Sequence, residues 1–212
     1  MRTFLRLKNQ QPGHLPPEFA GEELRYPEEL VATFLRQFTR PGQAVLDPFA
    51  GYGTTLVVAE AMGRAGFGVE ADARRVRYAR ARLAHPERLV HGDARALGQY
   101  ALPPIDFCMA SPPFMAHDEA ENVISGERRA DAYASYLADI ARVYAGLAPL
   151  LRPGARAVIE VANLKGPGGT TMLAWDVARA VAQALTFEGE VVIGWDRYDY
   201  GYDHSYCLVF RA

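Results

Sequence analysis

The feature that most constrains the fold is a regular alternation of short apolar runs with longer amphipathic segments, from residue 44 to the end of the chain. The short runs are typical of buried strands, whereas the segments between them repeat apolar residues at helical spacing. Strands that alternate with helices predict a mainly parallel sheet covered on both faces, because each parallel connection needs a crossover. We therefore expect a doubly wound α/β fold.

The sequence predicts seven strands, and the short connection between the last two predicts a C-terminal antiparallel hairpin. The expected strands are 44–47, 66–70, 88–93, 105–110, 155–164, 189–198 and 204–211. The expected helices are 26–38, 54–62, 73–84, 131–151 and 170–185. Outside these elements we expect an irregular N-terminal arm, a mobile substrate loop and a further short loop, at residues 1–24, 114–130 and 165–169.

Composition limits the class of protein and of partner. The 212 residues, half of them hydrophobic, suffice for one core. The net charge of −2 gives no overall sign of a nucleic-acid-binding protein, although Arg2, Arg6 and Lys8 make the N-terminus locally basic. Cys108 and Cys207 lie in apolar runs, as buried thiols do, and no Cys/His spacing predicts a metal site. Without a visible signal peptide or membrane-spanning run, a cytoplasmic location is expected.

A glycine-rich turn follows the first core strand, in the sequence VLDPFAGYGTT. Gly51 and Gly53 tolerate positive φ and let a ligand approach the backbone, and open parallel sheets bind ligands at the carboxyl ends of their strands. A phosphate-binding P-loop is excluded because the turn contains no lysine. A dinucleotide site is disfavoured because Leu56 stands where a third glycine is needed. A nucleoside without a pyrophosphate remains.

Acidic residues end the next two strands. Glu70 closes GFGVE, where a carboxylate can accept both ribose hydroxyls, and Asp93 in HGDA is placed to accept an amine hydrogen of a purine. Together with the turn they fit S-adenosylmethionine. For each residue alone a structural role is the simpler interpretation: Asp47 would cap the turn, Glu70 would be a surface acid and Asp93 would begin a turn.

The strand IDFCMA ends abruptly in SPPF, residues 111–114. Two prolines cannot continue a central strand, and their fixed φ angles hold one carbonyl rigidly. The segment belongs to the same expected edge of the sheet as the glycine-rich turn, which favours a site over a rigid turn with a core phenylalanine. At another strand end, Asn163 and Lys165 either contact substrate or form a loop cap.

In combination, DPFAGYGTT and SPPF resemble the amino-group DNA methyltransferases, which methylate exocyclic amines of cytosine or adenine. The resemblance extends from RYPEEL to the closing HSYCLVFR and implies the class I S-adenosylmethionine-dependent methyltransferase fold. The serine form of SPPF is more similar to the cytosine 4-amino enzymes than to most adenine enzymes. The cofactor site that the resemblance implies consists of Tyr26, Pro27, Asp47, Phe49, Ala50, Gly51, Gly53, Thr54, Glu70 and Asp93.

The resemblance also implies that Ser111, Pro112, Pro113 and Phe114 are the catalytic residues. An exocyclic amine is a poor nucleophile because its lone pair is conjugated with the ring, and acceptors aimed at its hydrogens favour the geometry of attack. The Ser111 hydroxyl and the Pro112 carbonyl are such acceptors, and Phe114 can stack on an extruded base.

The sequence therefore predicts a DNA methyltransferase that acts on the 4-amino group of cytosine. The chain is expected to form a single domain, 1–212, in which no target-recognition domain of ordinary size is visible. This departure leaves open methylation of an RNA base amine, and a cofactor-binding module whose specificity comes from a partner. A homodimer would also supply the missing contacts. The expected partner is nucleic acid, with DNA favoured over RNA, and no membrane association is expected.

Overall fold

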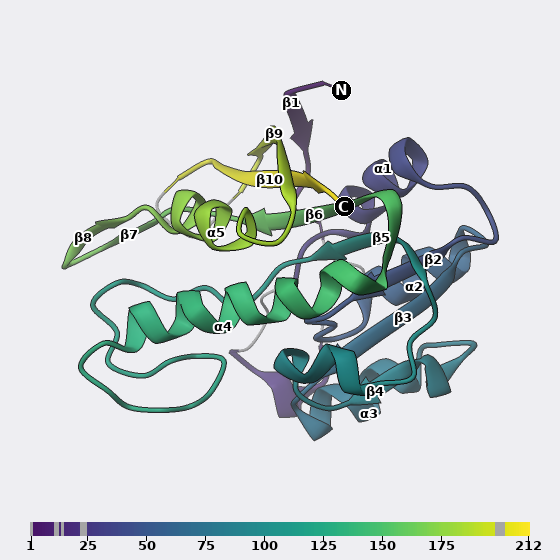
Figure 1. Ribbon diagram of the computed structural model, residues 1–212, viewed down its shortest axis with the longest axis horizontal. Coiled ribbons are helices and arrows are strands. Elements are labelled where there is room, and N and C mark those ends of the chain that lie inside the picture. The colour runs from purple at the N-terminus through teal and green to yellow at the C-terminus, as the bar shows by residue number, and fades with distance from the viewer. Residues whose placement is uncertain (1, 11–12, 14, 22–24, 198–201) are drawn as a thin grey trace.

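The computed structural model describes residues 2–10, 13, 15–21, 25–197 and 202–212, and its centre is a sheet flanked by helices (Figure 1). The strands are β1 (Phe4–Leu7), β2 (Ala44–Asp47), β3 (Ala65–Glu70), β4 (Leu89–His91), β5 (Ile105–Ala110), β6 (Leu151–Val161), β7 (Leu164–Gly166), β8 (Gly169–Thr171), β9 (Thr186–Trp195) and β10 (His204–Arg211). The α-helices are α1 (Glu28–Phe38), α2 (Thr54–Ala61), α3 (Ala73–Arg80), α4 (Ala132–Leu147) and α5 (Leu173–Val181). Short 3₁₀ segments lie at Pro17–Phe19, Pro86–Arg88, Ala94–Gln99 and Ala148–Leu150.

Eight strands of the described residues form the main sheet, in the order β1-β9-β10-β6-β5-β2-β3-β4. β10 is antiparallel to its neighbours β6 and β9, and every other neighbouring pair is parallel. This topology confirms the doubly wound α/β class and the C-terminal antiparallel hairpin. The sheet has one strand more than the seven expected, because β1 is added beside β9.

The N-terminal arm was expected to be irregular, and for Phe4–Leu7 that expectation is wrong. Leu5 and Leu7 pack against the core that includes α1, whereas Arg6 between them is exposed. The segment therefore alternates as a strand with one buried face does. β1 pairs in parallel with β9, almost at the other end of the chain, so no feature close in sequence indicates the pairing.

Residues 165–169 were expected to be a loop, but most of them belong to a second, two-stranded sheet. β7 and β8 pair in antiparallel fashion, and Pro167 and Gly168 occupy the turn between them. Proline and glycine favour tight turns, so the composition that suggested a loop is also the composition of a hairpin turn. In Figure 1 this hairpin projects to the left of the main sheet.

Two hydrophobic layers cover the main sheet. On one face, Leu30 of α1 and Val58 of α2 pack into a fully or nearly fully buried cluster with strand residues. On the other face, Tyr136 of α4 and Val177 of α5 belong to the larger cluster. These two helices lie in front of the sheet in Figure 1. The helices on both faces leave the strand ends as the edge at which a ligand can bind.

Cys108 and Cys207 are free and fully buried, as their apolar surroundings in the sequence predict. Burial raises the pKa of both thiols well above its usual value, so both remain protonated and pack as small apolar groups. Among the residues that the structure describes, none of the helices has the length and apolar character needed to traverse a bilayer.

The carboxyl ends of the parallel strands β2 to β6 meet at one edge of the sheet. Asp47 ends β2, Glu70 ends β3 and Ser111 follows β5 directly. β2 and β5 are neighbours in the sheet, so the glycine-rich turn and the SPPF segment leave the sheet side by side. This edge is therefore the candidate site.

Candidate active site

The turn between β2 and α2 is organised by the carboxylate of Asp47. It accepts hydrogen bonds from the Phe49 amide (2.9 Å), the Thr55 hydroxyl (2.7 Å) and the Tyr26 hydroxyl (2.9 Å). Only 1% of Asp47 is exposed, and burial raises the pKa of its carboxyl to about 6. Asp47 thus caps the turn from within the protein, which is the structural role that the sequence left open for it.

The two glycines of the turn have positive φ angles, 53° for Gly51 and 82° for Gly53. A side chain at Gly53 would place its Cβ 3.0 Å from the Cβ of Ala79 on α3, so packing requires glycine there. At Gly51 the nearest atom to such a Cβ would be the carbonyl oxygen of Phe49, at 3.9 Å. The backbone at Gly51 is therefore open to the close approach of a ligand.

The segment before α1 reaches the same turn. Pro27 is buried and caps the start of α1, and the Tyr26 hydroxyl forms hydrogen bonds with both Asp47 and Thr55. Burial and then the charge of Asp47 raise the pKa of Tyr26 well above its usual value, so the phenol stays protonated. The structure thus brings Tyr26 and Pro27 to the glycine-rich turn, where the resemblance implied they would lie.

Glu70 lies at the end of β3 and is only 9% exposed, so it is not a surface acid. Its Oε2 accepts the Gly51 amide and its Oε1 accepts the Asp72 amide, both at 2.8 Å. A carboxylate oxygen can accept more than one hydrogen bond, so each oxygen keeps a further acceptor position. The carboxylate is therefore fixed against the turn and still able to accept two hydroxyl groups.

Asp93 follows β4, and its carboxylate is held by Arg95. The Arg95 guanidinium donates to Oδ1 at 3.1 Å and to Oδ2 at 2.7 Å, and the Arg95 amide donates to Oδ1 at 2.8 Å. The side-chain hydrogen bonds from Arg95 lower the pKa of Asp93. Arg95 also pairs with Asp139 of α4 at 3.3 Å. Asp93 thus begins the 3₁₀ segment Ala94–Gln99, and its contact with a purine stays a prediction.

The SPPF segment is held at both ends by buried side chains. Ser111 donates through Oγ to Oε2 of Glu160 at 2.9 Å, and Glu160 is a 4% exposed residue near the end of β6. The Pro113 carbonyl accepts a hydrogen bond from the Tyr136 hydroxyl of α4 at 3.0 Å. Phe114 is partly buried against the cluster that contains α4. The segment is therefore fixed in position at the carboxyl edge.

Comparison with known proteins gives a match in sequence over the first part of the chain. Residues 6–81 match the N6/N4 family described as DNA methylase. A stretch of 57 residues is 42% identical to the type II methyltransferase M2.DpnII of Streptococcus pneumoniae. These matches support the amino-group DNA methyltransferase family. The 57 residues cover 27% of this chain and 21% of the relative, so the match spans about a fifth of that protein's length.

Solved structures share the fold over most of the chain. TrmN from Thermus thermophilus has a TM-score of 0.65 and 21% identity, covering 92% of this chain and 51% of its own. A TehB-like SAM-dependent methyltransferase from Corynebacterium glutamicum has a TM-score of 0.54 and 20% identity, covering 91% of each chain. Precorrin-6y C5,15-methyltransferase from Geobacter metallireducens has a TM-score of 0.60 and 13% identity, covering 90% of this chain and 93% of its own. The fold is the class I methyltransferase fold.

The family match covers the glycine-rich turn of the candidate site but not its SPPF segment. Residues 6–81 include Tyr26, Asp47 and Glu70, and end before Asp93 and the SPPF segment. The match therefore includes the predicted cofactor residues up to Glu70, and their contact with the cofactor stays a prediction. The assignment of the catalytic segment depends on the geometry at the end of β5.

The structure gathers the predicted residues at one edge of the sheet. The predicted cofactor residues of the glycine-rich turn, the end of β3 and the start of α1 lie together: Tyr26, Pro27, Asp47, Phe49, Ala50, Gly51, Gly53, Thr54 and Glu70. Directly after β5 it places Ser111, partly exposed, Pro112, buried, Pro113, exposed, and Phe114, partly exposed. Asp93 belongs to the same edge, at the end of β4, with its carboxylate engaged by Arg95.

Two residues that contact the SPPF segment were missed from the sequence. Glu160 interrupts the apolar run AVIEVA, and an acid in a buried strand is a signal that the sequence contains. Tyr136 has no comparable signal, because a tyrosine on the apolar face of a helix is an ordinary core residue. Both act on the segment through side-chain hydrogen bonds.

The segment expected to be a mobile substrate loop, 114–130, is anchored to its surroundings. Asn122 is fully buried, and its amide donates to Asp139 of α4 at 2.8 Å. The His117 amide donates to the Thr171 hydroxyl of β8 at 3.0 Å. The loop and the β7–β8 hairpin therefore contact each other.

The other strand-end candidate is a cap. Asn163, which follows β6, accepts the Ala174 amide through Oδ1 at 3.0 Å in the first turn of α5. The Lys165 ammonium lies 4.0 Å from the centre of the Tyr202 ring. Of the two roles considered for Asn163, the structure shows the loop cap.

Phe19 of the N-terminal arm packs against the glycine-rich turn. Phe19 is fully buried and meets Tyr52 of the turn and Tyr78 of α3 edge to face, with ring centres 5.1 and 5.6 Å away. Such aromatic pairs add to the stability that burial alone provides. Phe19 therefore helps to hold Tyr52 and the turn in place.

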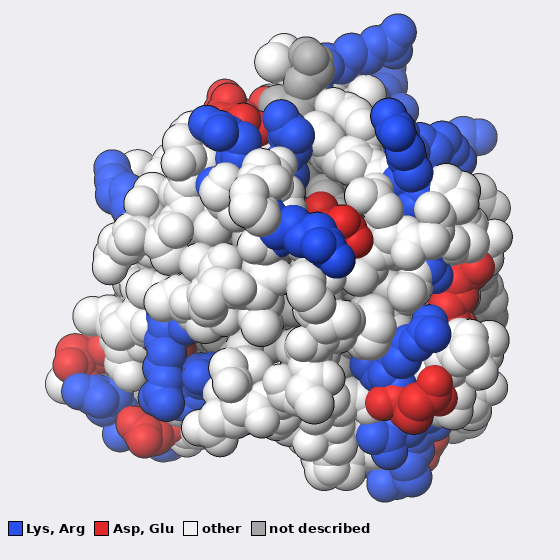
Figure 2. Space-filling model, turned by 45° about the vertical axis from the view of Figure 1, so that its right-hand side comes forward, with Lys and Arg blue, Asp and Glu red and all other residues white. Residues whose placement is uncertain are grey.

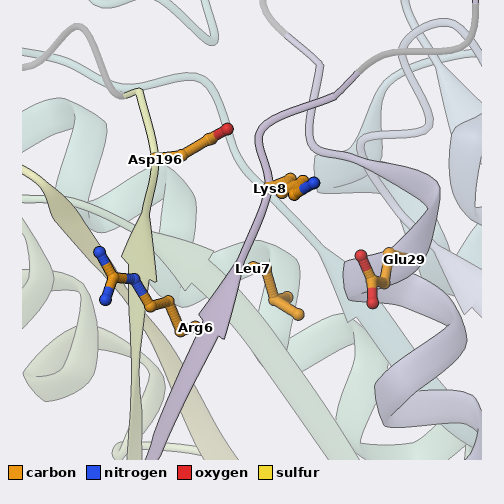
Figure 3. Close-up of a pocket in the computed structure, with 5 residues that line it drawn as sticks. All are labelled: Arg6, Leu7, Lys8, Glu29 and Asp196. Carbon is orange, nitrogen blue, oxygen red and sulfur yellow. The ribbon is translucent and has the colours of Figure 1, made fainter.

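A cavity of about 560 Å³ lies apart from this site (Figure 3). Its lining comes from β1 and the residue after it, the first turn of α1 and the residue after β9: Arg6, Leu7, Lys8, Glu29 and Asp196. The two basic and two acidic side chains of this lining leave the cavity with no net charge. The candidate site is built instead from the ends of β2, β3 and β5, so we do not assign the chemistry to this cavity.

Proposed function

We propose that this chain is an S-adenosylmethionine-dependent methyltransferase that methylates an exocyclic amino group of a nucleobase, the 4-amino group of cytosine in DNA. The observation that carries the proposal is the position of the SPPF segment, beside the glycine-rich turn at the ends of neighbouring strands. The match to DNA methylases supports the amino group of a base as the target. The serine of SPPF supports cytosine rather than adenine.

The residues present fit the proposed cofactor. The open backbone at Gly51 gives room for close approach, and Glu70 keeps acceptor positions for two ribose hydroxyls. Asp47 holds the turn in shape through three hydrogen bonds. When bound, S-adenosylmethionine supplies an electrophilic methyl group.

The chain's own residues activate the amine. Ser111 and the Pro112 carbonyl accept its hydrogens, which favours the pyramidal nitrogen and stabilises positive charge as it develops. The hydrogen bond from Tyr136 to Pro113 keeps the diproline carbonyls from shifting. Phe114 stacks on the base. Much of the rate enhancement comes from holding the reacting groups in line.

Phosphate contacts are available on the N-terminal strand. Arg2, Arg6 and Lys8 are exposed on or beside β1. Figure 2 shows several blue Lys and Arg side chains at the upper end of the molecule, with red acidic side chains beside some of them, and mixed signs elsewhere on the face in view. Such a local basic surface attracts nucleic acid even where the net charge of the chain is slightly negative.

The test is the identity of the methylated nucleoside. The purified chain is incubated with S-adenosylmethionine carrying a deuterated methyl group and with DNA or RNA of mixed sequence. The nucleic acid is then digested and analysed by mass spectrometry. The expected product is deuterated N4-methylcytosine from DNA, and label found only on carbon or ribose positions contradicts the proposal.

A second candidate substrate is an RNA base amine. The loop beside SPPF is rich in acids, Asp118, Glu119 and Glu121 among them, and all three are exposed. Exposed carboxylates repel a duplex phosphate backbone, which favours a substrate whose base reaches the site from a flexible strand. Product from RNA alone in the same experiment would select this candidate. Activity that requires added protein would instead indicate a partner that supplies specificity.

A further inference from the structure

Glu160 is a buried acid in an apolar strand. It is 4% exposed, lies between Ile159 and Val161, and belongs to a strand with β5 on one side and β10 on the other. Burying a carboxylate costs solvation free energy, and an apolar residue is accommodated more easily at such a position. A carboxylate at this position therefore needs a compensating interaction.

The hydrogen bond with Ser111 is one such interaction. In the parallel pair β5–β6, Ala110 lies opposite Ile159, so the next residues, Ser111 and Glu160, come side by side. The Ser111 hydroxyl donates to Oε2 of Glu160 at 2.9 Å. A hydroxyl has one hydrogen and two lone pairs, so this bond directs the hydrogen toward Glu160 and leaves the oxygen free to accept from another donor.

We infer that Glu160 is a positioning residue for the methyl transfer, and the inference rests on the proposed function. Glu160 orients Ser111 as an acceptor for the substrate amine and takes up the proton that is released. As the nitrogen–carbon bond forms and the sulfur–carbon bond breaks, the amine proton passes to Oγ of Ser111. The hydroxyl proton of Ser111 passes to Glu160, so the sulfonium charge and the carboxylate charge disappear together.

The other titratable groups around Glu160 are proton donors at neutral pH. Cys207 of β10 lies opposite Glu160 in the sheet, and burial followed by the charge of Glu160 raises the pKa of its thiol. Tyr26 forms a hydrogen bond with Asp47, and burial followed by the charge of Asp47 raises the pKa of its phenol, to which the charge of Glu160 also contributes. Glu160 is thus the member of this set that touches Ser111 and accepts its proton.

The test compares isosteric variants in the assay that identifies the methylated base. Glu160→Gln keeps the shape of the side chain and removes its charge. We expect kcat to fall on the order of 10²-fold, the lower range for loss of acid–base assistance, with KM little changed. Because Glu160 acts through Ser111, Ser111→Ala combined with Glu160→Gln is expected to lose no more than Ser111→Ala alone.

Three controls separate this role from a structural one. Glu160→Asp keeps the carboxylate on a shorter side chain and is expected to recover part of the lost kcat. Glu188→Gln makes the same chemical change on β9, where Glu188 pairs with Arg156 and Arg211, and is expected to leave kcat unchanged. Calorimetric binding of S-adenosylhomocysteine, which does not depend on activity, is expected to match wild type in Glu160→Gln.

The inference is overturned if Glu160→Gln keeps the wild-type kcat. It is also overturned if the fold-losses in kcat of the two single variants multiply in the double variant. Either result leaves the proposed function standing. Should Glu160→Gln fail to fold, the Glu160→Asp variant decides, because wild-type kcat in that protein contradicts a role that depends on position. A wild-type chain that methylates no base amine overturns the proposed function and this inference together.

Discussion

The buried carboxyl of Asp47 makes stability depend on pH in an unusual direction. Burial raises its pKa to about 6 in the folded protein, from 3.8 for an unperturbed carboxyl. Between these values the folded state binds more protons than the unfolded state, so stability is fully present below about pH 4 and falls as the pH rises through 6. Carboxylates that are ion-paired in the folded state act in the opposite sense, because folding lowers their pKa.

The magnitude follows from the two values. A difference of about 2 pH units at 1.36 kcal/mol per unit corresponds to about 3 kcal/mol, which ionised Asp47 costs the folded protein at pH 7. Asp47→Asn removes the ionisation and keeps the shape. The variant is therefore expected to match wild type near pH 4 and to exceed it by up to about 3 kcal/mol at pH 7, measured by urea unfolding at a series of pH values.

A matched control makes the same carboxyl-to-amide change at Asp72, a residue whose pKa is lowered rather than raised by folding. Hydrogen bonds from Arg74 lower the pKa of Asp72 to about 2, so Asp72 is ionised throughout the range from pH 4 to 7. Asp72→Asn is expected to lower stability by a constant amount over that range, without a change of slope. If the curves of Asp47→Asn and wild type ran parallel between pH 4 and 7, the reasoning about burial would be refuted.

Three further outcomes are expected. Tyr136→Phe removes the hydrogen bond to Pro113 and is expected to lower stability by about 1 kcal/mol and kcat several-fold. Tyr144→Phe on the same helix is expected to leave turnover unchanged and not to lower stability in urea unfolding, because the buried Tyr144 hydroxyl has no hydrogen-bond partner among the described residues and no bond is lost. Ser111→Ala is expected to lower kcat at least as much as Glu160→Gln, on the order of 10²-fold or more, while calorimetry shows unchanged binding of S-adenosylhomocysteine. Between pH 7 and pH 5, affinity for S-adenosylmethionine is expected to fall by up to about tenfold, because Asp47, with its pKa of about 6, becomes protonated. Affinity for S-adenosylhomocysteine, whose sulfur is neutral, is expected to fall less. Equal falls in affinity for the two ligands, measured by calorimetry, would contradict a charge effect.

The sequence is sufficient to predict which residues share an edge of the sheet. Asp47, Glu70 and Ser111 each follow an apolar run, and helical segments separate these runs. Right-handed parallel connections bring the carboxyl ends of such strands to one edge without knowledge of the strand order. The positive φ at Gly51 likewise follows from residue type and position in a strand-to-helix turn. These predictions depend on local pattern and on one connection rule.

Contacts between distant segments are not contained in the local pattern. The bond between Ser111 and Glu160 depends on which strand lies beside β5 and on their register. Strand β1 depends on its pairing with β9, and four residues alone carry too little pattern to predict it. Tyr136 and Tyr144 are both fully buried tyrosines of α4, and only the structure distinguishes the one that contacts SPPF.

The charges at the carboxyl edge explain why a destabilising residue such as Asp47 is useful there. Asp47 and Glu70 accept hydrogen bonds from neutral amides and hydroxyls, so these bonds leave their negative charge in place. In a site with little water, buried carboxylates attract a positively charged ligand more strongly than they would in solution. The sulfonium of the proposed cofactor is such a ligand, whereas the thioether that remains after methyl transfer is neutral. The same charge that weakens the folded state at neutral pH therefore favours the cofactor over its product, and stability lost in the free protein is regained when the cofactor binds.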